Sequence, residues 1–260
     1  MTRWYVGLIA MVTLALPARA ADKPLTIRWL GQSFFLITSS QGTKIAIDPH
    51  ALEAFGRQTV TADAVLMTHL HPDHVRVEVI ENKDKAKILP GLKQTGGTAD
   101  GRRPRVTWNP IEETIKDVRI RSVGTYHDTQ QGMERGRNTV FVLEVDGLKV
   151  VHLGDLGHVL TDDQVRQIGT MDVLMVPIGG VYTLNGSKAK EVVAQLKPKR
   201  YVLPMHYGTR TFEDLLPPDE FLEGQKNIKR MLNVNELTVA ASEAVPAEPA
   251  IVLLGWEKKK

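Results

Sequence analysis

The chain has 260 residues, of which 42% are hydrophobic and 24% are charged, values typical of a folded globular protein with a full core. Its formal net charge of +3 falls to +1 without Arg3 and Arg19, and Lys258–Lys260 supply three of the remaining positive charges. The body of the chain is thus slightly acidic, which argues against a nucleic-acid partner, and the absence of cysteine excludes disulfides and a lipid-modified N-terminus.

Residues 1–20 have the pattern of a secretory signal peptide. Arg3 precedes the apolar run Trp4–Leu16, and Ala18–Ala20 has the small-x-small ending at which such peptides are cleaved. The run is shorter than the roughly 20 residues that span a bilayer, so a stable membrane anchor is not expected. We therefore predict that residues 21–260 form one mature domain, in the periplasm or outside the cell.

Short β-rich segments dominate the first half of the chain. Three of them alternate with turn residues, which predicts an antiparallel meander of Leu25–Leu30, Phe34–Thr38 and Lys44–Asp48. Ala64–Thr68 has the continuous apolar pattern of a buried strand. An Asp146-Gly147 hairpin turn separates the last two of the further predicted strands. These strands are Val118–Val123, Thr139–Val145 and Lys149–Leu153.

Helical and strand patterns alternate in the second half, as they do in βαβ units. The predicted helices are Thr161–Ile168, Ser187–Leu196 and Pro217–Met231, and the predicted strands are Asp172–Pro177, Tyr201–Met205 and Ala250–Leu254. Glu243–Ala250 is interpreted as a loop, because too little chain follows it to form another domain. Meanders combined with crossovers predict an α/β fold of the αββα type, a four-layer sandwich of two mixed sheets flanked by helices.

Histidine and aspartate residues follow the ends of several predicted strands. The sequence THLHPDHV places His69, His71, Asp73 and His74 directly after the strand that ends at Thr68. Strand ends on one rim of a sandwich converge in space, so residues in this position can share one site, although any one histidine alone is more often structural. The others in this position are His50, His127, Asp155, His158 and His206.

The spacing within THLHPDHV suits two metal ions better than one. In an extended chain His69 and His71 point to the same side, and Pro72 then favours a turn that rotates Asp73 and His74 away from that pair. Imidazole and carboxylate ligands without thiolate suit Zn²⁺, with Mn²⁺ or Fe²⁺ as alternatives. The sequence therefore predicts half of a dinuclear centre in this loop.

Four features resemble the motif set of the metallo-β-lactamase superfamily: H-x-H-x-D-H at His69–His74, the later His127, Gly154-Asp155, and His206. Asp48-Pro49 resembles the acidic strand end that opens this set, and the resemblance extends from about Leu25 to Gly208. The stretches WLGQSFFLI, HLGDLGH and PMHYGT resemble one branch in particular, the L-ascorbate-6-phosphate lactonase-like metal-dependent hydrolases. N-acylphosphatidylethanolamine phospholipase D is a more distant likeness.

The resemblance implies a role for each of these residues. The implied ligands of the first metal are His69, His71 and His127, those of the second are Asp73, His74 and His206, and Asp155 bridges both. Strand alternation places His152 on the opposite face from Asp155, so we interpret it as structural or as support for a ligand. We expect Asp48 to orient a ligand or the loop and His158 to line the substrate pocket. Weaker pocket candidates are Asn138 and Tyr207, and His50 stays undecided.

Metal-dependent hydrolysis of a small molecule is the favoured function. Two cations lower the pKa of a bridging water to about 7 and polarise the bond that is cleaved, and Asp73 is expected to carry the proton to the leaving group. A lactone or other ester is the first expected substrate and a phosphodiester the second. Three other functions are less favoured. The resemblance argues against a β-lactamase, since such enzymes normally lack a bridging carboxylate like that of Asp155. The near-neutral charge argues against a nuclease. The filled ligand positions argue against a non-catalytic metal-binding protein.

Overall fold

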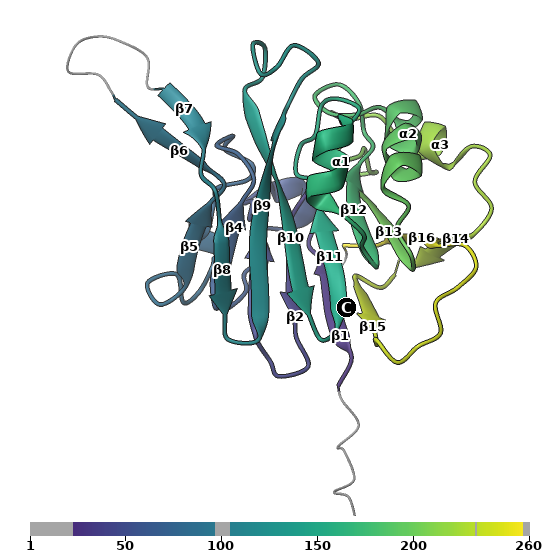
Figure 1. The fold of residues 1–260 in the computed structure, drawn as a ribbon, viewed down its shortest axis with the longest axis horizontal. Coiled ribbons are helices and arrows are strands. Elements are labelled where there is room, and N and C mark those ends of the chain that lie inside the picture. Colours follow the sequence, from purple (N-terminus) through teal and green to yellow (C-terminus); the bar gives the residue numbers. More distant parts are fainter. Residues whose placement is uncertain (1–22, 97–104, 232, 257–260) are drawn as a thin grey trace, which may run out of the picture.

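A computed structural model of the protein describes residues 23–96, 105–231 and 233–256. Two β-sheets pack face to face in it, and a separate two-stranded ribbon extends from one side (Figure 1). The predicted signal peptide, residues 1–20, lies outside the described residues.

The six-stranded sheet has the order β15-β1-β2-β3-β4-β5. Its strands β1, β2 and β3 form the predicted antiparallel meander, and β4 and β5 add parallel to β3. The strands are β1 (Leu25–Trp29), β2 (Phe35–Thr38), β3 (Lys44–Ile47), β4 (Ala64–Met67), β5 (Lys87–Pro90) and β15 (Glu236–Val239). The parallel addition places the loops after β3 and β4 at the same edge of the sheet.

The eight-stranded sheet has the order β14-β16-β13-β12-β11-β10-β9-β8. Its antiparallel half is β8 (Glu112–Ile115), β9 (Val118–Tyr126), β10 (Arg137–Val145) and β11 (Leu148–His152). Its parallel half is β12 (Val173–Pro177), β13 (Tyr201–Met205), β16 (Ala250–Leu254) and β14 (Ile228–Met231). The predicted hairpin turn joins β10 to β11, and Asp146 and Gly147 have the positive φ angles, 52° and 74°, that such a turn requires.

The main core lies between the sheets. It holds fully buried side chains from both, including Trp29 and Phe35 of the first and Phe141 of the second. Burial of each such side chain contributes roughly 1.5–3 kcal/mol, so this layer is the main source of cohesion between the sheets. A smaller apolar cluster, which includes Phe34 and Val65, packs on the other face of the six-stranded sheet.

The helices gather over the outer face of the eight-stranded sheet (Figure 1). They are α1 (Asp162–Ile168), α2 (Gly186–Leu196) and α3 (Asp219–Leu222). Thr161 begins α1 with a reciprocal capping box to Gln164, and Asn185 caps α2. Within the described residues the six-stranded sheet has only two 3₁₀ turns in the corresponding layer, Glu53–Phe55 and Val77–Val79. The fold class is therefore as predicted, with one helical layer much reduced.

The predicted helix Pro217–Met231 is wrong. Only Asp219–Leu222 is helical, Gly224 follows with a φ of 76°, and Ile228–Met231 forms β14 beside β16. The hydrogen bonds of β14 come from a strand that occurs later in the chain, which no local pattern reveals. The two strands of the ribbon, β6 (Leu92–Thr95) and β7 (Arg105–Trp108), were not predicted either.

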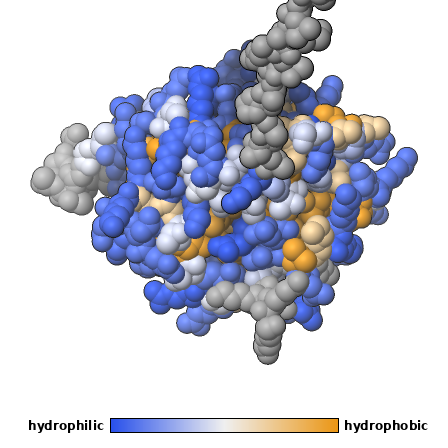
Figure 2. All heavy atoms as spheres, turned by 90° about the horizontal axis from the view of Figure 1, so that it is seen from below, coloured by the Kyte–Doolittle hydropathy of each residue, from blue (hydrophilic) through white to orange (hydrophobic). Residues whose placement is uncertain are grey.

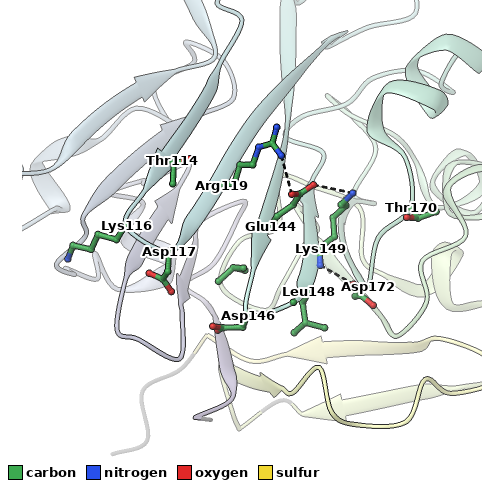
Figure 3. Close-up of a pocket in the computed structure, with 12 residues that line it drawn as sticks. Thr114, Lys116, Asp117, Arg119, Glu144, Asp146, Leu148, Lys149, Thr170 and Asp172 are labelled. Carbon is green, nitrogen blue, oxygen red and sulfur yellow. Dashed lines mark hydrogen bonds and ion pairs between the residues drawn. The ribbon is translucent and has the colours of Figure 1, made fainter. Parts of the chain in front are cut away.

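Parts of the surface away from the strand-end loops are strongly polar. On the outer face of the eight-stranded sheet, below α1, Glu144 lies between Arg119 and Lys149 at 3.8 and 3.3 Å (Figure 3). These three side chains border a depression of about 580 Å³. Hydrophilic residues also dominate the end of the molecule that is shown in Figure 2, with small apolar patches between them. Among the helices that the structure describes, none is long and apolar enough to cross a membrane.

Candidate metal centre

The loops that follow five strands meet at one rim of the sandwich. Those after β3 and β4 come from the six-stranded sheet, and those after β9, β11 and β13 come from the other. Three sets of side chains have possible ligand atoms within 4.8 Å of one another. The sets are His69, His71 and His127; Asp73, His74 and His206; and Asp48, His69 and His74. The first two are the two triplets that the family resemblance implies.

Asp155 lies at the centre of this cluster. Its Oδ2 atom is 3.1 Å from Nε2 of His206, 3.2 Å from that of His127, 3.3 Å from that of His74 and 3.7 Å from that of His69. One carboxylate oxygen has about two lone-pair positions and cannot accept four hydrogen bonds. Convergence of four imidazoles on one oxygen is therefore the arrangement expected where a carboxylate is shared between cations.

Four ring nitrogens of the cluster have no hydrogen-bond partner within the described residues. They are Nδ1 of His127, Nδ1 of His206 and both nitrogens of His74, and all three side chains are buried; only those of His74 lie near carboxylates, Asp48 at 3.0 Å and Asp155 at 3.3 Å. Buried polar atoms are nearly always paired, so these orphaned atoms call for an occupant that the protein itself does not supply. Imidazole and carboxylate donors fit divalent cations such as Zn²⁺, Mn²⁺ or Fe²⁺.

The pKa directions of Asp155, His69 and His71 match the charge state that binds metal, and His74 departs from it: burial lowers its pKa, but Asp155 and Asp48 outweigh burial and raise the value well above the usual range. Burial raises the pKa of Asp155, but the neighbouring His206 and His74 outweigh it and hold the value well below the usual range. Burial lowers the pKa of His69 and His71, and the adjacent imidazoles lower it further. An ionised carboxylate beside neutral imidazoles is the state in which such residues act as ligands.

Asp48 and His152 support the cluster from behind. Asp48 accepts hydrogen bonds of 2.7 Å from both the backbone N–H and the hydroxyl of Thr68, and it lies 3.0 Å from Nδ1 of His74. It therefore orients His74 and the ligand loop, as the sequence led us to expect. His152 contacts the Ser33 carbonyl at 2.9 Å and accepts from the Gly154 N–H at 3.1 Å, so it joins two loops behind the site.

Two contacts come from residues that the sequence did not single out. The turn between β1 and β2 brings Gln32 Nε2 to 3.1 Å from Asp73 Oδ2 and Ser33 Oγ to 3.3 Å from Asp155 Oδ1. Both residues belong to WLGQSFFLI, one of the stretches that carry the family resemblance. The sequence feature that could have revealed these contacts is the adjacent pair of polar residues, Gln32 and Ser33, in the tight turn between two predicted strands.

Glycine permits the close approach of the loops that carry ligands. A Cβ at Gly157 would overlap the carbonyl of His127, and a Cβ at Gly179 would overlap the carbonyl of His206. The close approach allows backbone hydrogen bonds: the N–H of Gly157 donates to the carbonyl of Tyr126, and the N–H of Gly179 donates to the carbonyl of His206. The second glycine in HLGDLGH, Gly157, is thus explained by its packing against the loop of the ligand candidate His127.

The structure gives His158 a position different from the predicted one. Its Nε2 accepts from the backbone N–H of Tyr126 at 3.2 Å, and its Nδ1 lies 2.8 Å from the Val159 carbonyl. Both ring nitrogens are engaged with backbone groups, so neither is available to a substrate. His158 is a loop-bridging residue in this geometry.

The remaining candidates also have structural contacts. His50 is buried between the Gly31 carbonyl and the Leu52 N–H, and burial lowers its pKa to about 4. Asn138 accepts from the backbone N–H of Asp155 at 3.0 Å and so fixes the loop that carries this carboxylate. The ring of Tyr207 stacks on Trp29 with centroids 5.5 Å apart. None of the three contributes to the ligand sets described above.

The model of the β-lactamase superfamily domain matches residues 26–206, which include every ligand candidate. The chain belongs to this superfamily. It is 31% identical to a UPF0173 metal-dependent hydrolase of Thermococcus onnurineus over 195 residues, 70% of this chain and 84% of that protein. It is 30% identical to a UPF0173 protein of Pyrococcus furiosus, over 86% of this chain and 98% of the relative.

A solved structure from Thermotoga maritima supports the same assignment. That protein has been described as a candidate Zn-dependent hydrolase of the metallo-β-lactamase superfamily. It shares 35% sequence identity and a TM-score of 0.65 with this chain, over 89% of this chain and 98% of its own. The family resemblance inferred from the sequence is therefore confirmed.

Proposed function

We propose that the protein is a metal-dependent hydrolase that binds two divalent cations and cleaves a lactone or other ester of a small molecule. The observation that carries the proposal is the convergence of four imidazoles on Oδ2 of Asp155, with an imidazole-rich triplet on either side. Relatives named as metal-dependent hydrolases support the reaction class. We assign Zn²⁺ as the resident ion, with Mn²⁺ and Fe²⁺ as alternatives.

The residues present divide the work of such a reaction. Bound divalent cations would supply an activated water and charge stabilisation at the bond that is cleaved. Asp155 would hold the two sites together, and Asp48 keeps His74 aimed at its site. Asp73 is the most accessible carboxylate of the cluster, with one third of its side chain exposed, and Gln32 holds its Oδ2 atom. We propose that Asp73 carries the proton to the leaving group.

The choice of an ester rests on the resemblance of WLGQSFFLI, HLGDLGH and PMHYGT to the lactonase-like branch. A phosphodiester is the second candidate, because the same stretches resemble the phospholipase D more distantly. We further propose that the protein acts after export, in the periplasm or outside the cell. That proposal rests on the signal-peptide pattern of residues 1–20 alone.

One panel of chromogenic lactone, ester, phosphodiester and β-lactam substrates tests this proposal, with Zn²⁺ or Mn²⁺ added to the purified protein. We expect turnover of the esters and lactones, loss of that turnover with a chelator, and its recovery when the metal is restored. His69→Ala should abolish turnover without unfolding the protein. Lys149→Ala, far from the cluster on the outer face of the eight-stranded sheet, is the control that should not change it.

Full-rate hydrolysis by the metal-free protein would overturn the proposed mechanism. Turnover of the β-lactam substrate alone would favour a β-lactamase, and turnover of the phosphodiester alone would favour the second candidate. Elemental analysis of the same preparation should approach two transition-metal ions per chain.

A further inference from the structure

We infer that the substrate carries an anionic group, a carboxylate or a phosphate, and that Arg135 and Arg137 bind this group beside the metal centre. The inference rests on the proposed hydrolase function and deepens it by naming a substrate class. Its starting point is a cavity of about 320 Å³ that opens next to His69 and His71. A cavity of this size holds a small molecule.

The cavity lies between the ribbon and the loop that precedes β10. Leu92 and Val106 of the ribbon form an apolar wall, and Gly132 and Gly136 of the loop form another. The ligands His69 and His71 form the floor. A molecule whose reacting bond lies at these histidines therefore extends between the ribbon and the loop.

Arg137 also lines this cavity, and two contacts with the ribbon fix its side chain. Its Nη1 donates to the Val106 carbonyl at 2.9 Å, and its guanidinium carbon lies 4.7 Å from the centre of the Trp108 ring. Its Nε is buried and has no hydrogen-bond partner in the part of the chain that the structure describes. The buried Nε cannot reach a molecule in the cavity, but the guanidinium is fixed where Arg137 lines the cavity, and such a cation is prepared to bind an anion.

Arg135 approaches the same cavity from the loop. Its Nη2 donates to the Val181 carbonyl at 3.0 Å, and its guanidinium carbon lies 5.1 Å from the centre of the Tyr182 ring. The loop itself is fixed by Asp128, whose carboxylate accepts from the backbone N–H of Arg135 at 2.8 Å and from three others, Gln130, Gly132 and Glu134. The position of Arg135 is therefore set before any ligand arrives.

No carboxylate of the described residues balances the charge of the cavity. The described residues that line it include no aspartate or glutamate, and neither arginine forms an ion pair with a described carboxylate. Both arginines are half-buried, and a half-buried cation without a carboxylate partner is stabilised when an anion binds beside it. An anionic substrate group is the partner that this arrangement fits.

A pair of esters with acyl chains of equal length tests the inference. The anionic probe is the para-nitrophenyl half-ester of adipic acid, and the neutral probe is para-nitrophenyl hexanoate. Charge-assisted hydrogen bonds contribute about 1.5–3 kcal/mol, so the wild-type ratio of kcat/KM should favour the half-ester by about 10-fold or more. Arg135→Gln and Arg137→Gln should each reduce this ratio, and the double variant should bring it to about 1.

Arg137→Lys keeps the charge but loses the planar fork, so its ratio should fall between those of wild type and Arg137→Gln. Lys93→Gln is the matched control. It removes an exposed charge from β6, next to the cavity-lining Gln94, and should leave the ratio unchanged. Thermal melting of each variant would show whether the fold is kept. A wild-type ratio near 1, or an unchanged ratio in the double variant, would overturn the inference.

Calorimetric titration of the metal-loaded protein with adipate gives a readout that does not need turnover. Its dissociation constant should rise by about 10-fold or more in Arg137→Gln and stay unchanged in Lys93→Gln. Hexyl phosphate in the same titration compares a phosphate with a carboxylate. If neither ester is hydrolysed but binding depends on the arginines, the proposed ester hydrolysis fails while this inference stands. If esters are hydrolysed but the dissociation constant of adipate is the same in the arginine variants as in wild type, the proposed ester hydrolysis stands and this inference fails.

Discussion

Asp155→Asn is the substitution that tests the candidate centre most directly. The change keeps the shape of the side chain, its backbone hydrogen bond to Asn138 and its contact with Ser33, but it removes the negative charge from the meeting point of four imidazoles. Loss of a group that only supports a ligand costs about 10- to 100-fold in metal affinity, equivalent to about 1.4–2.8 kcal/mol. Loss of the shared carboxylate should weaken the second cation by at least that amount and remove most turnover.

His152→Ala is the matched comparison, since it alters the same region from the opposite face of β11. It leaves the Ser33 carbonyl and the Gly154 N–H without their partner in a buried place. Each unsatisfied group costs about 1–3 kcal/mol, so the free energy of unfolding should fall by about 2–6 kcal/mol. Metal affinity should fall by no more than about 10- to 100-fold.

Zinc titration, denaturant unfolding and turnover measured on both variants separate the two effects. Asp155→Asn should bind one metal tightly and, compared with wild type in the metal-free state, unfold near the same midpoint, whereas His152→Ala should bind two metals but unfold at lower denaturant in that state. Two tightly bound metals and normal turnover in Asp155→Asn would refute the bridging role.

Two further outcomes follow from the structure and a third follows from the sequence alone. Gly157→Ala should force the His127 loop away from the centre, which lowers both the melting temperature and the affinity of the first metal, and calorimetric zinc titration would measure this. Asp128→Asn should lower the unfolding free energy by about 1–3 kcal/mol at neutral pH. Burial raises the pKa of Asp128 but the backbone N–H groups around it outweigh this and lower the pKa, so the difference from wild type should persist above about pH 4 and shrink as the pH falls below it, in denaturant titrations. N-terminal sequencing of the native protein should begin at Ala21, and a soluble form that begins at Met1 would contradict export.

The sequence was informative where local patterns and local hydrogen bonds coincide. The meander, the hairpin at Asp146-Gly147 and the strand that precedes THLHPDHV were all predicted near their observed positions. The seven predicted ligands lie together because each follows or flanks a strand end at one rim, and such ends converge in either sheet. Their individual roles as ligands stay a prediction that the variants above would test.

The failures involve partners that are remote in the chain. Ile228–Met231 reads as helical because its strand partner, β16, occurs about twenty residues later. The edge strand β5 was missed because its first two residues are exposed and carry no alternation. The two arginines of the cavity were not recognised, since nothing in the local sequence indicates that the ribbon comes to lie against their loop.

The origin of the ligands in two sheets has a consequence for folding. The side chains after β3 and β4 belong to one sheet and those after β9, β11 and β13 to the other, so the full ligand set exists only once the sheets have docked. Cations that bind only the docked form add to its stability by mass action, about 2.7 kcal/mol for each site at a hundredfold excess over its dissociation constant. The concentration of free metal would then set how strongly the two sheets stay docked. A chelator would lower the free energy of unfolding of the whole molecule as well as stop its chemistry.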